Sequence, residues 1–422
     1  MKLILLNILI FSNLSFGQPD SSINDYGNFG LNDLISSALK TNLNLEPIEY
    51  EKKILSAKIN QVNKQPSPML QFMIDYLPVN LDNAGEFSLL YSQPLRLFGK
   101  LGAEENLAKQ NAYKPVITKI ELENELIKSI KENYFMLSVS ERLLEFNYEF
   151  QQILISITKS IEIRYSVGKG NQYEIMKSNN ELQKLLLEEI DLRNNKNILV
   201  NNLETLSNLD LPNDYKTKNI EILLNISPLE LDTSELITIM KVNNTDFQYL
   251  DLTKEENILE RKISELERKP DLTLMSGYRY LSKSKTNTLL FSISLDLPFM
   301  PWNSKRIDAI IEQKNLTEKK INSELKALKQ NRRNELRNIL IKMNSSLEKI
   351  KYISAILIPQ TEQTFKSALI GYETTSNEFI DLLDTYRSTR ENNRMLIEEE
   401  INYLILISDL EKLVGKEILT IN

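Results

Sequence analysis

The sequence predicts a mainly α-helical protein with a membrane β-barrel contribution. It is expected to contain two copies of one unit, in the order helix, β-hairpin, long helix, long helix. Glycine and proline number only 11 and 13 among 422 residues, well below ordinary usage, which favours long helices. Similar residues recur at an offset of about 204 to 207 positions, as a duplication would produce. Four segments alternate apolar and polar residues with the period of a β-strand.

The first segment has the form of a secretory signal peptide. Lys2 precedes an apolar stretch, 3–16, of about 14 residues, which is too short to span a bilayer and typical of a signal sequence. A small-residue site ending at Gly17 predicts cleavage that leaves Gln18 first. We therefore expect residues 1–17 to be a signal peptide, the alternative being a buried N-terminal helix. Because the sequence has no cysteine, we expect no lipid anchor on an N-terminal cysteine.

The absence of two residue types limits the kinds of metal site and active site that the protein can contain. The sequence has neither histidine nor cysteine, which excludes zinc sites built on those residues, catalytic thiols, disulfides and a Ser-His-Asp triad. A hydrolase that used carboxylates alone would show a compact α/β pattern, and the sequence has none. We therefore expect no enzyme activity, no cofactor and no metal site. The net charge of −7, without a dense basic run, argues against nucleic-acid binding.

The two copies are aligned by recurring residues of similar type. Pro66 corresponds to Pro270 at the start of the hairpins, and Tyr165 corresponds to Tyr372 at the far end of the long helices. The segment between the copies contains prolines and has the character of a linker. The predicted division is residues 18–208 for the first repeat, 209–233 for the linker and 234–422 for the second repeat.

Each copy contains one predicted hairpin, at about 67–98 and 271–299. In the second, every other residue from Leu289 to Leu297 is apolar, and the residues between them include Ser292, Ser294 and Asp296. This pattern fits strands with lipid on one face and water on the other, although a soluble hairpin on a core has the same period. Because the smallest bilayer barrels have eight strands, the hairpins predict that several chains build one barrel.

The remainder of each copy is predicted to form two long helices. The outgoing helices span 100–164, where Pro115 is the main breaker, and 304–370, where Pro359 is the only one. At 1.5 Å per residue each reaches about 95–100 Å. Helices of this length imply side-by-side packing as coiled coils, and Pro359 should kink its helix. Returning helices are predicted at 171–207 and 377–414, so that helices cover about 100–207 and 303–416.

Short motifs mark the ends of these elements. Strand-to-helix junctions carry Ser92-Gln93-Pro94-Leu95 and Leu297-Pro298-Phe299, and the first helical turn carries Tyr165-Ser166-Val167-Gly168. Tyr372 precedes the second turn, and Asp381-Leu382-Leu383-Asp384-Thr385 follows it. In the order, spacing and duplication of these motifs, nearly the whole mature chain resembles the outer-membrane efflux family typified by TolC. The junction residues in this resemblance are Pro66, Pro94, Gly99, Pro270 and Pro298.

The resemblance implies a homotrimer in which three chains of four strands each supply a 12-stranded β-barrel in outer-membrane lipid. A coiled-coil α-barrel tunnel would continue it through the periplasm. It also implies a passive export duct that docks on a periplasmic adaptor (membrane fusion) protein and an inner-membrane pump of the RND, ABC or MFS class. Drugs, metal ions and proteins stay open as cargo. The alternative is a secreted periplasmic coiled-coil or adaptor protein without a barrel, which would leave both hairpins unexplained.

The resemblance further assigns a gate at the periplasmic end of the tunnel. Asp381 and Asp384 are three residues apart, on one face of a helix, and a trimer would place them in two carboxylate rings that attract cations. Glu174, the first-copy equivalent of Asp381, is implied to accept a hydrogen bond from Tyr372 that holds the tip closed. The plainer interpretations are a solvated acidic face and a packed aromatic at a helix end.

Two helical turns at the same end are implied to dock on the adaptor. In the first, Gly168 and Gly170 suit a tight turn because glycine adopts positive φ. The second turn departs from the pattern, with Thr375 and Asn377 at the corresponding positions, so its docking is the weaker expectation. The residues assigned to the two tips are Tyr165, Val167, Gly168, Gly170, Gly371 and Ser376.

Overall fold

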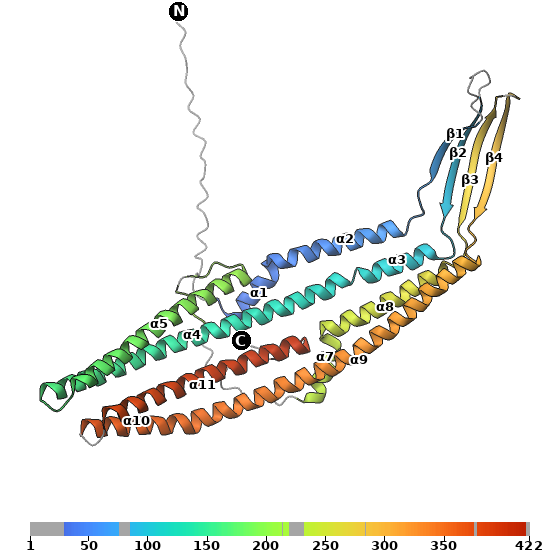
Figure 1. The fold of residues 1–422 in the computed structure, drawn as a ribbon. Coiled ribbons are helices and arrows are strands. Elements are labelled where there is room, and N and C mark those ends of the chain that lie inside the picture. The colour runs from blue at the N-terminus through green and yellow to red at the C-terminus, as the bar shows by residue number, and fades with distance from the viewer. Residues whose placement is uncertain are drawn as a thin grey trace, which may run out of the picture.

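A computed structural model of the protein describes residues 29–75, 85–212, 214–218, 232–282, 284–374 and 378–418. The predicted signal peptide, residues 76–84 of the first predicted hairpin and most of the predicted linker lie outside these residues. The described chain is elongated. Long helices run side by side in a curved layer, with a four-stranded sheet at one end and the turns between outgoing and returning helices at the other (Figure 1).

The first half of the chain forms two short helices, two strands and three further helices, where the sequence predicts one helix, a hairpin and two long helices. A single 3₁₀ turn, Leu43–Leu45, joins the two short helices. The elements are α1 (Leu31–Thr41), α2 (Glu46–Val62), β1 (Met69–Asp75), β2 (Glu86–Leu95), α3 (Lys100–Asn111), α4 (Lys114–Ser166) and α5 (Gln172–Ser207).

The second half repeats this order of elements. Its outgoing helix is interrupted by a π-helical segment, Ile353–Leu357. The elements are α7 (Thr233–Asn243), α8 (Thr245–Leu266), β3 (Leu272–Leu281), β4 (Thr286–Leu295), α9 (Pro301–Tyr352), α10 (Ile358–Glu373) and α11 (Phe379–Val414).

Two asparagines show how closely the halves agree in local structure. Asn42 ends α1 and Asn244 ends α7, and each side-chain oxygen then accepts from the backbone N–H two residues on, at 3.0 and 3.1 Å. Asparagine is favoured at this position because its side chain caps the free N–H groups of a helix start. Each side-chain amide also donates to a carbonyl near the end of the returning helix, Leu206 for Asn42 and Leu413 for Asn244, both at 2.9 Å.

The four strands form one antiparallel sheet in the order β1-β2-β3-β4. The register places Phe72, Leu89, Tyr278 and Leu289 side by side across the sheet. Residues one position further along belong to the opposite face. There the guanidinium of Arg279 donates to Ser88 Oγ at 3.1 Å and lies 3.8 Å from the carboxylate of Glu86. One face is thus apolar and aromatic, and the other carries charged and hydroxyl side chains, as predicted.

The outgoing helices differ from the prediction at two places. The helix expected at 100–164 is two helices, because the chain breaks at Ala112 and Tyr113 before Pro115 enters the first turn of α4. Proline lacks the N–H that an unbroken helix would need there, and it fits a first turn. Near Pro359, the predicted change takes the form of the π-helical segment, which ends two residues before the proline.

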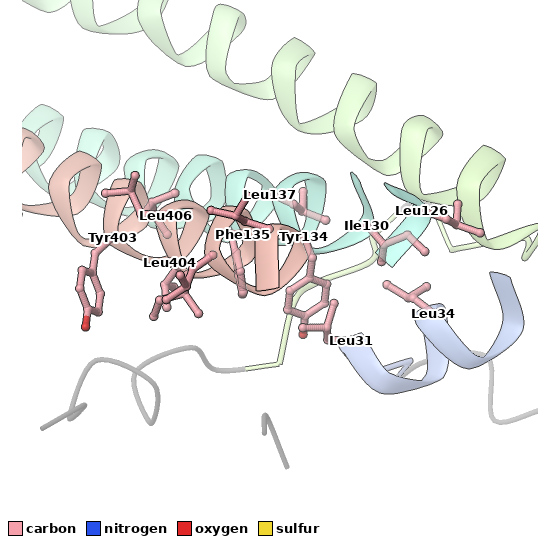
Figure 2. Close-up of a cluster of buried hydrophobic side chains, with 14 of the residues drawn as sticks. Leu31, Leu34, Leu126, Ile130, Tyr134, Phe135, Leu137, Tyr403, Leu404 and Leu406 are labelled. Carbon is pink, nitrogen blue, oxygen red and sulfur yellow. The ribbon is translucent and has the colours of Figure 1, made fainter. Parts of the chain in front are cut away.

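The core consists of two clusters of buried side chains. One lies in the middle of the molecule, where α1, α4 and α11 converge, and includes Leu34, Ile130, Tyr134 and Leu404 (Figure 2). The other lies beneath the turns between the long helices and includes Tyr372.

The helices have a fixed lateral order. Towards the sheet they lie in the order α2, α3, α8, α9, and towards the turns in the order α5, α4, α11, α10. One long edge of the layer is therefore formed by α2 and α5, and the other by α9 and α10 (Figure 1).

Within the described ranges, no helix combines the length and apolar content that crossing a bilayer requires.

Candidate functional site: the helical tip

The tip consists of the two turns that join α4 to α5 and α10 to α11. In the first, Gly168 has a φ of 74°, and a Cβ at Gly170 would lie 2.8 Å from the backbone nitrogen of Tyr165. Gly168 is therefore needed for its left-handed conformation, whereas Gly170 is needed because the returning chain passes so close. Asn171 then begins α5 by accepting from the N–H of Tyr173 at 3.1 Å. The predicted tight turn is present, with different reasons for its two glycines.

The first turn presents apolar side chains outward. Val167 is 63% exposed and Tyr165 is 48% exposed, beside Ile163 on the last turn of α4. Single exposed apolar residues are ordinary, but a cluster at one end of a long molecule indicates a contact surface. In the second turn Gly371 is buried, and Ser376, Thr375 and Asn377 lie outside the described residues. The structure therefore describes the predicted docking residues of the first tip, and Gly371 alone of those in the second.

Tyr372 lies at the centre of the tip. Its ring is 2% exposed and belongs to the apolar cluster with Phe379. Its hydroxyl donates to Glu174 Oε2 at 2.8 Å, which joins α10 to α5. The guanidinium of Arg164 lies 4.4 Å from the centre of the tyrosine ring and donates to the backbone carbonyl of Tyr372. The structure thus brings together the two residues that the resemblance paired, and adds an arginine from α4.

Burial keeps the tyrosine hydroxyl in its donor form. Removal from water, and next the hydrogen bond to Glu174, raise the pKa of Tyr372 above its ordinary value. A phenol whose pKa is raised stays protonated through neutral pH. Tyr372 therefore remains able to donate to the carboxylate under all ordinary conditions.

The two acids predicted at the aperture share one face of α11. Asp381 and Asp384 are both exposed, beside the buried Leu382 and Leu383. Asp384 lies 3.9 Å from a guanidinium nitrogen of Arg387. Its side chain is 69% exposed, so water screens this contact strongly. The pair thus presents carboxylates to solvent at the end of the molecule, in the first turns of the returning helix.

A second set of side-chain contacts at the tip joins α5 to α11 and was not predicted from the sequence. Arg387 binds Glu181 through two nitrogens, at 2.6 and 3.1 Å, and only 5% of Glu181 is exposed. The hydrogen bond from Arg387 lowers the pKa of Glu181, against the opposing effect of burial. One step further from the tip, Arg390 binds Glu188 at 2.5 Å. The spacing does contain a signal: Glu181 is two helical turns beyond Glu174, so both belong to one face of α5.

The predicted junction residues lie at the other end of the molecule, next to the strands. Lys100, which is 3% exposed, donates to the backbone carbonyl of Lys269 at 2.8 Å and pairs with Asp271 at 2.9 Å. Gln93 donates to the carbonyl of Pro66 at 2.8 Å. Pro94 lies within β2, Gly99 precedes α3, and Pro270 and Pro298 flank β3 and β4. The contacts of Lys100 join the start of α3 to the residues just before β3.

Comparison with solved structures decides the fold. The protein CusC, described in connection with transmembrane channel formation, matches with a TM-score of 0.78 at 17% identity, over 95% of this chain and 96% of that one. The MtrE outer-membrane channel of Neisseria gonorrhoeae matches with a TM-score of 0.74 at 16% identity, over 92% and 89%. The CmeC outer-membrane channel of Campylobacter jejuni matches with a TM-score of 0.73 at 15% identity, over 98% and 94%.

The chain has the fold of outer-membrane channels. The predicted resemblance to the TolC-like proteins is confirmed at this level. The sequence matches no protein-family model and no curated protein sequence. The fold likeness extends over nearly all of the described chain, so it includes both the sheet and the tip.

Proposed function

We propose that the protein is the channel subunit of a tripartite efflux system in the outer membrane, and that it is exported by the signal peptide predicted at 1–17. It would form a passive duct from a periplasmic adaptor and an inner-membrane RND, ABC or MFS pump to the exterior. The observation that carries this proposal is the channel fold, combined with a sheet whose apolar face is open to its surroundings. The agreement between the two halves supports their origin as repeats at 18–208 and 234–422.

The apolar sheet face has the size and character of a lipid-facing surface. Along β4 and its extension, Leu289, Phe291, Ile293, Leu295 and Leu297 point to one side and are 48 to 80% exposed. They cover about nine residues of the chain, which is the length that a tilted barrel strand needs to cross the apolar layer of a bilayer. A soluble protein would cover such a patch. The opposite face, with Arg279 and Ser88, would line the water-filled interior.

The edges of the molecule support a barrel closed by several chains. β1 and β4 are each paired on one side only among the described strands. They continue into the α2 and α9 edges of the helical layer. Exposed apolar residues also follow both edges, at Leu187 and Ile190 on α5 and at Tyr352 and Ile356 near α10. Joining one edge to the opposite edge of a second copy is a heterologous contact, which closes into a ring. Three copies would supply the implied 12 strands.

Cysteine cross-linking tests this assembly, because the chain has no cysteine of its own. Leu187 and Ile356 lie at similar distances from the tip, about 16 and about 18 residues, or about 24 and about 27 Å. The pair Leu187→Cys/Ile356→Cys is expected to form a covalent trimer on oxidation. The mismatched pair Leu187→Cys/Leu316→Cys should not, since Leu316 lies much nearer the sheet. If the matched pair gives no cross-linked product, or if both pairs cross-link equally, the proposed edge-to-edge contact is contradicted.

The gate is proposed to consist of the Tyr372–Glu174 hydrogen bond and the acidic pair Asp381 and Asp384. The hydrogen bond joins neighbouring helix pairs, so the tip cannot widen within a chain without breaking it. In a trimer the acids would form six carboxylates around the aperture, which attracts cations. The first turn, with Tyr165 and Val167 exposed, is the proposed adaptor-docking surface.

Conductance in a planar bilayer tests the function directly. The protein, expressed with its signal peptide and extracted from the outer-membrane fraction, is expected to give small cation-selective steps that a trivalent cation blocks from the tip side. Asp381→Ala/Asp384→Ala should weaken this block, because it removes the carboxylates that hold the ion. Failure to enter the membrane fraction, together with no conductance, would overturn the proposal in favour of a secreted periplasmic coiled-coil protein.

A further inference from the structure

An exposed aromatic patch lies at the junction between β4 and α9, and neither the sheet nor the helix core accounts for it. Phe299 is 65% exposed and Trp302, the single tryptophan of the chain, is 73% exposed. They follow directly on Leu297, the last residue of the apolar series along β4. Large aromatic side chains are rarely left this exposed at a helix start without a partner. Since the patch continues the proposed lipid-facing surface, its surroundings are expected to be partly apolar.

Two cations follow the tryptophan on the same face of α9. Lys305 and Arg306 are three and four residues beyond Trp302, so the three side chains are neighbours on the helix surface. Both cations are exposed. Arg306 donates to the neutral side-chain oxygen of Asn303 at 3.2 Å. Among the described residues no ion pair engages Lys305 or Arg306, whereas Arg268 close by pairs with Asp308 at 2.6 Å.

The helix itself does not account for these cations. Lys305 and Arg306 lie in the second turn of α9, beyond the first turn in which the helix dipole acts on side-chain charges. The first turn has no acidic residue to pair with them. Two exposed cations beside an aromatic ring, at the border of the apolar surface, are therefore placed to attract an anion from outside the chain.

We propose that these five residues, which we call the collar, anchor the protein in the membrane interface and bind anionic phospholipid headgroups on the helix side of the bilayer. The collar consists of Leu297, Phe299, Trp302, Lys305 and Arg306. This proposal rests on the proposed function, because it requires the sheet to lie in lipid. Aromatic rings with a polar edge prefer the level of the headgroups. Lys305 and Arg306 lie about 5–6 Å further along α9, which places them beside the phosphates, where each cation favours an anionic lipid.

The single tryptophan provides the measurement. The protein is reconstituted in vesicles of phosphatidylcholine with a minor fraction of phosphatidylglycerol, and only one of the two lipids carries brominated acyl chains, which quench tryptophan on contact. At equal mole fractions, brominated phosphatidylglycerol is expected to quench Trp302 more strongly. The expected enrichment is about fivefold for each cation. Equal quenching by the two lipids would overturn the proposed headgroup binding.

Charge variants show whether the two cations cause the preference. Lys305→Gln/Arg306→Gln is expected to make the two lipids quench equally, while total quenching persists. The matched control is Lys326→Gln/Lys329→Gln, which removes two exposed cations of the same helix about 35 Å further from the sheet. This control should retain the preference for phosphatidylglycerol. Loss of the preference in both variants would mean that general charge, not the collar, attracts the lipid, and would overturn the proposal.

A moved tryptophan separates failure of the collar from failure of the channel proposal. In Trp302→Phe/Phe291→Trp the fluorophore lies in the middle of the apolar sheet face, where Phe291 is 80% exposed. Quenching of this variant without quenching of Trp302 in the original chain would overturn the collar and leave the membrane-embedded sheet intact. Absence of quenching at both positions would overturn both proposals.

Discussion

Replacing Lys131 by Met is expected to lower the free energy of unfolding by about 3–5 kcal/mol. Lys131 lies on α4 in the central core and is 3% exposed. Its ammonium group pairs with Glu411 of α11 at 2.7 Å and with Glu417 at 3.2 Å. Glu411 is itself 8% exposed. The substitution keeps the volume of the side chain but leaves a buried carboxylate without this counter-charge. Chemical denaturation followed by circular dichroism at 222 nm, where the helices dominate, measures the loss.

An exposed pair provides the control for Lys131. Lys349 lies 3.4 Å from Glu399, but its side chain is 58% exposed, so Lys349→Met is expected to cost at most about 1 kcal/mol. In Lys131→Met/Glu411→Leu both charges are absent, and much of the stability lost in the single variant should return, since apolar replacement of a buried ion pair is often neutral. If Lys131→Met and Lys349→Met lowered the free energy of unfolding equally, the buried ion pair would contribute no more to stability than the exposed one.

The sequence was informative where structure depends on local pattern. Strand alternation, low glycine content and the two breaks at Pro66 and Pro270 predicted the hairpins and the order of the helices, because these features reflect the period of each element. The division at Ala112 and Tyr113 was missed. Pro115 can either kink one helix or begin another. The choice depends on how α3 packs between α2 and α8, which the local sequence does not contain.

At the tip, too, the sequence predicted some contacts and missed those that depend on packing between distant helices. Tyr372 and Glu174 were paired by resemblance to a family, and the hydrogen bond between them is present. Their roles in gating, and those of Asp381 and Asp384, stay proposals. Arg164 and Arg387 were missed, although both contact the site. The partner of each arginine lies on a helix about 200 residues away in the sequence, so a charged residue on a long polar face gives no sign of its partner.

Removing the hydroxyl of Tyr372 is expected to raise the fraction of time that the channel is open. In Tyr372→Phe the ring still fills its place in the apolar cluster, but the hydrogen bond to Glu174 is lost. A hydrogen bond to a charged group contributes about 1.5–3 kcal/mol. Glu174 is half-buried, so water replaces part of the lost hydrogen-bond energy. We therefore expect the ratio of open to closed tips to rise about tenfold per chain. Single-channel recording of the variant, without adaptor, measures it.

The neighbouring tyrosine provides a matched control. Tyr173 is 55% exposed, and its hydroxyl accepts from Lys177 within the same helix at 3.1 Å. Tyr173→Phe therefore makes the same chemical change at the same turn without unlinking two helices, and its opening should equal that of the original chain. In Tyr372→Phe/Glu174→Ala the effect should be no larger than in the stronger single variant, because both remove one interaction. Additive effects would mean that the two residues act separately.

The pH dependence of opening provides a second test of the same bond. Because burial raises the pKa of Tyr372 above its unfolded value near 10, the bond contributes fully below pH 10 and is lost only as pH rises through the raised pKa. The original chain should therefore stay mostly closed from neutral pH to about pH 9. Tyr372→Phe should show its higher opening over the whole of this range. If the original chain began to open near pH 8, the Tyr372 hydroxyl would have to lose its proton far below its unfolded pKa. That result would contradict a buried, protonated hydroxyl as the closing contact.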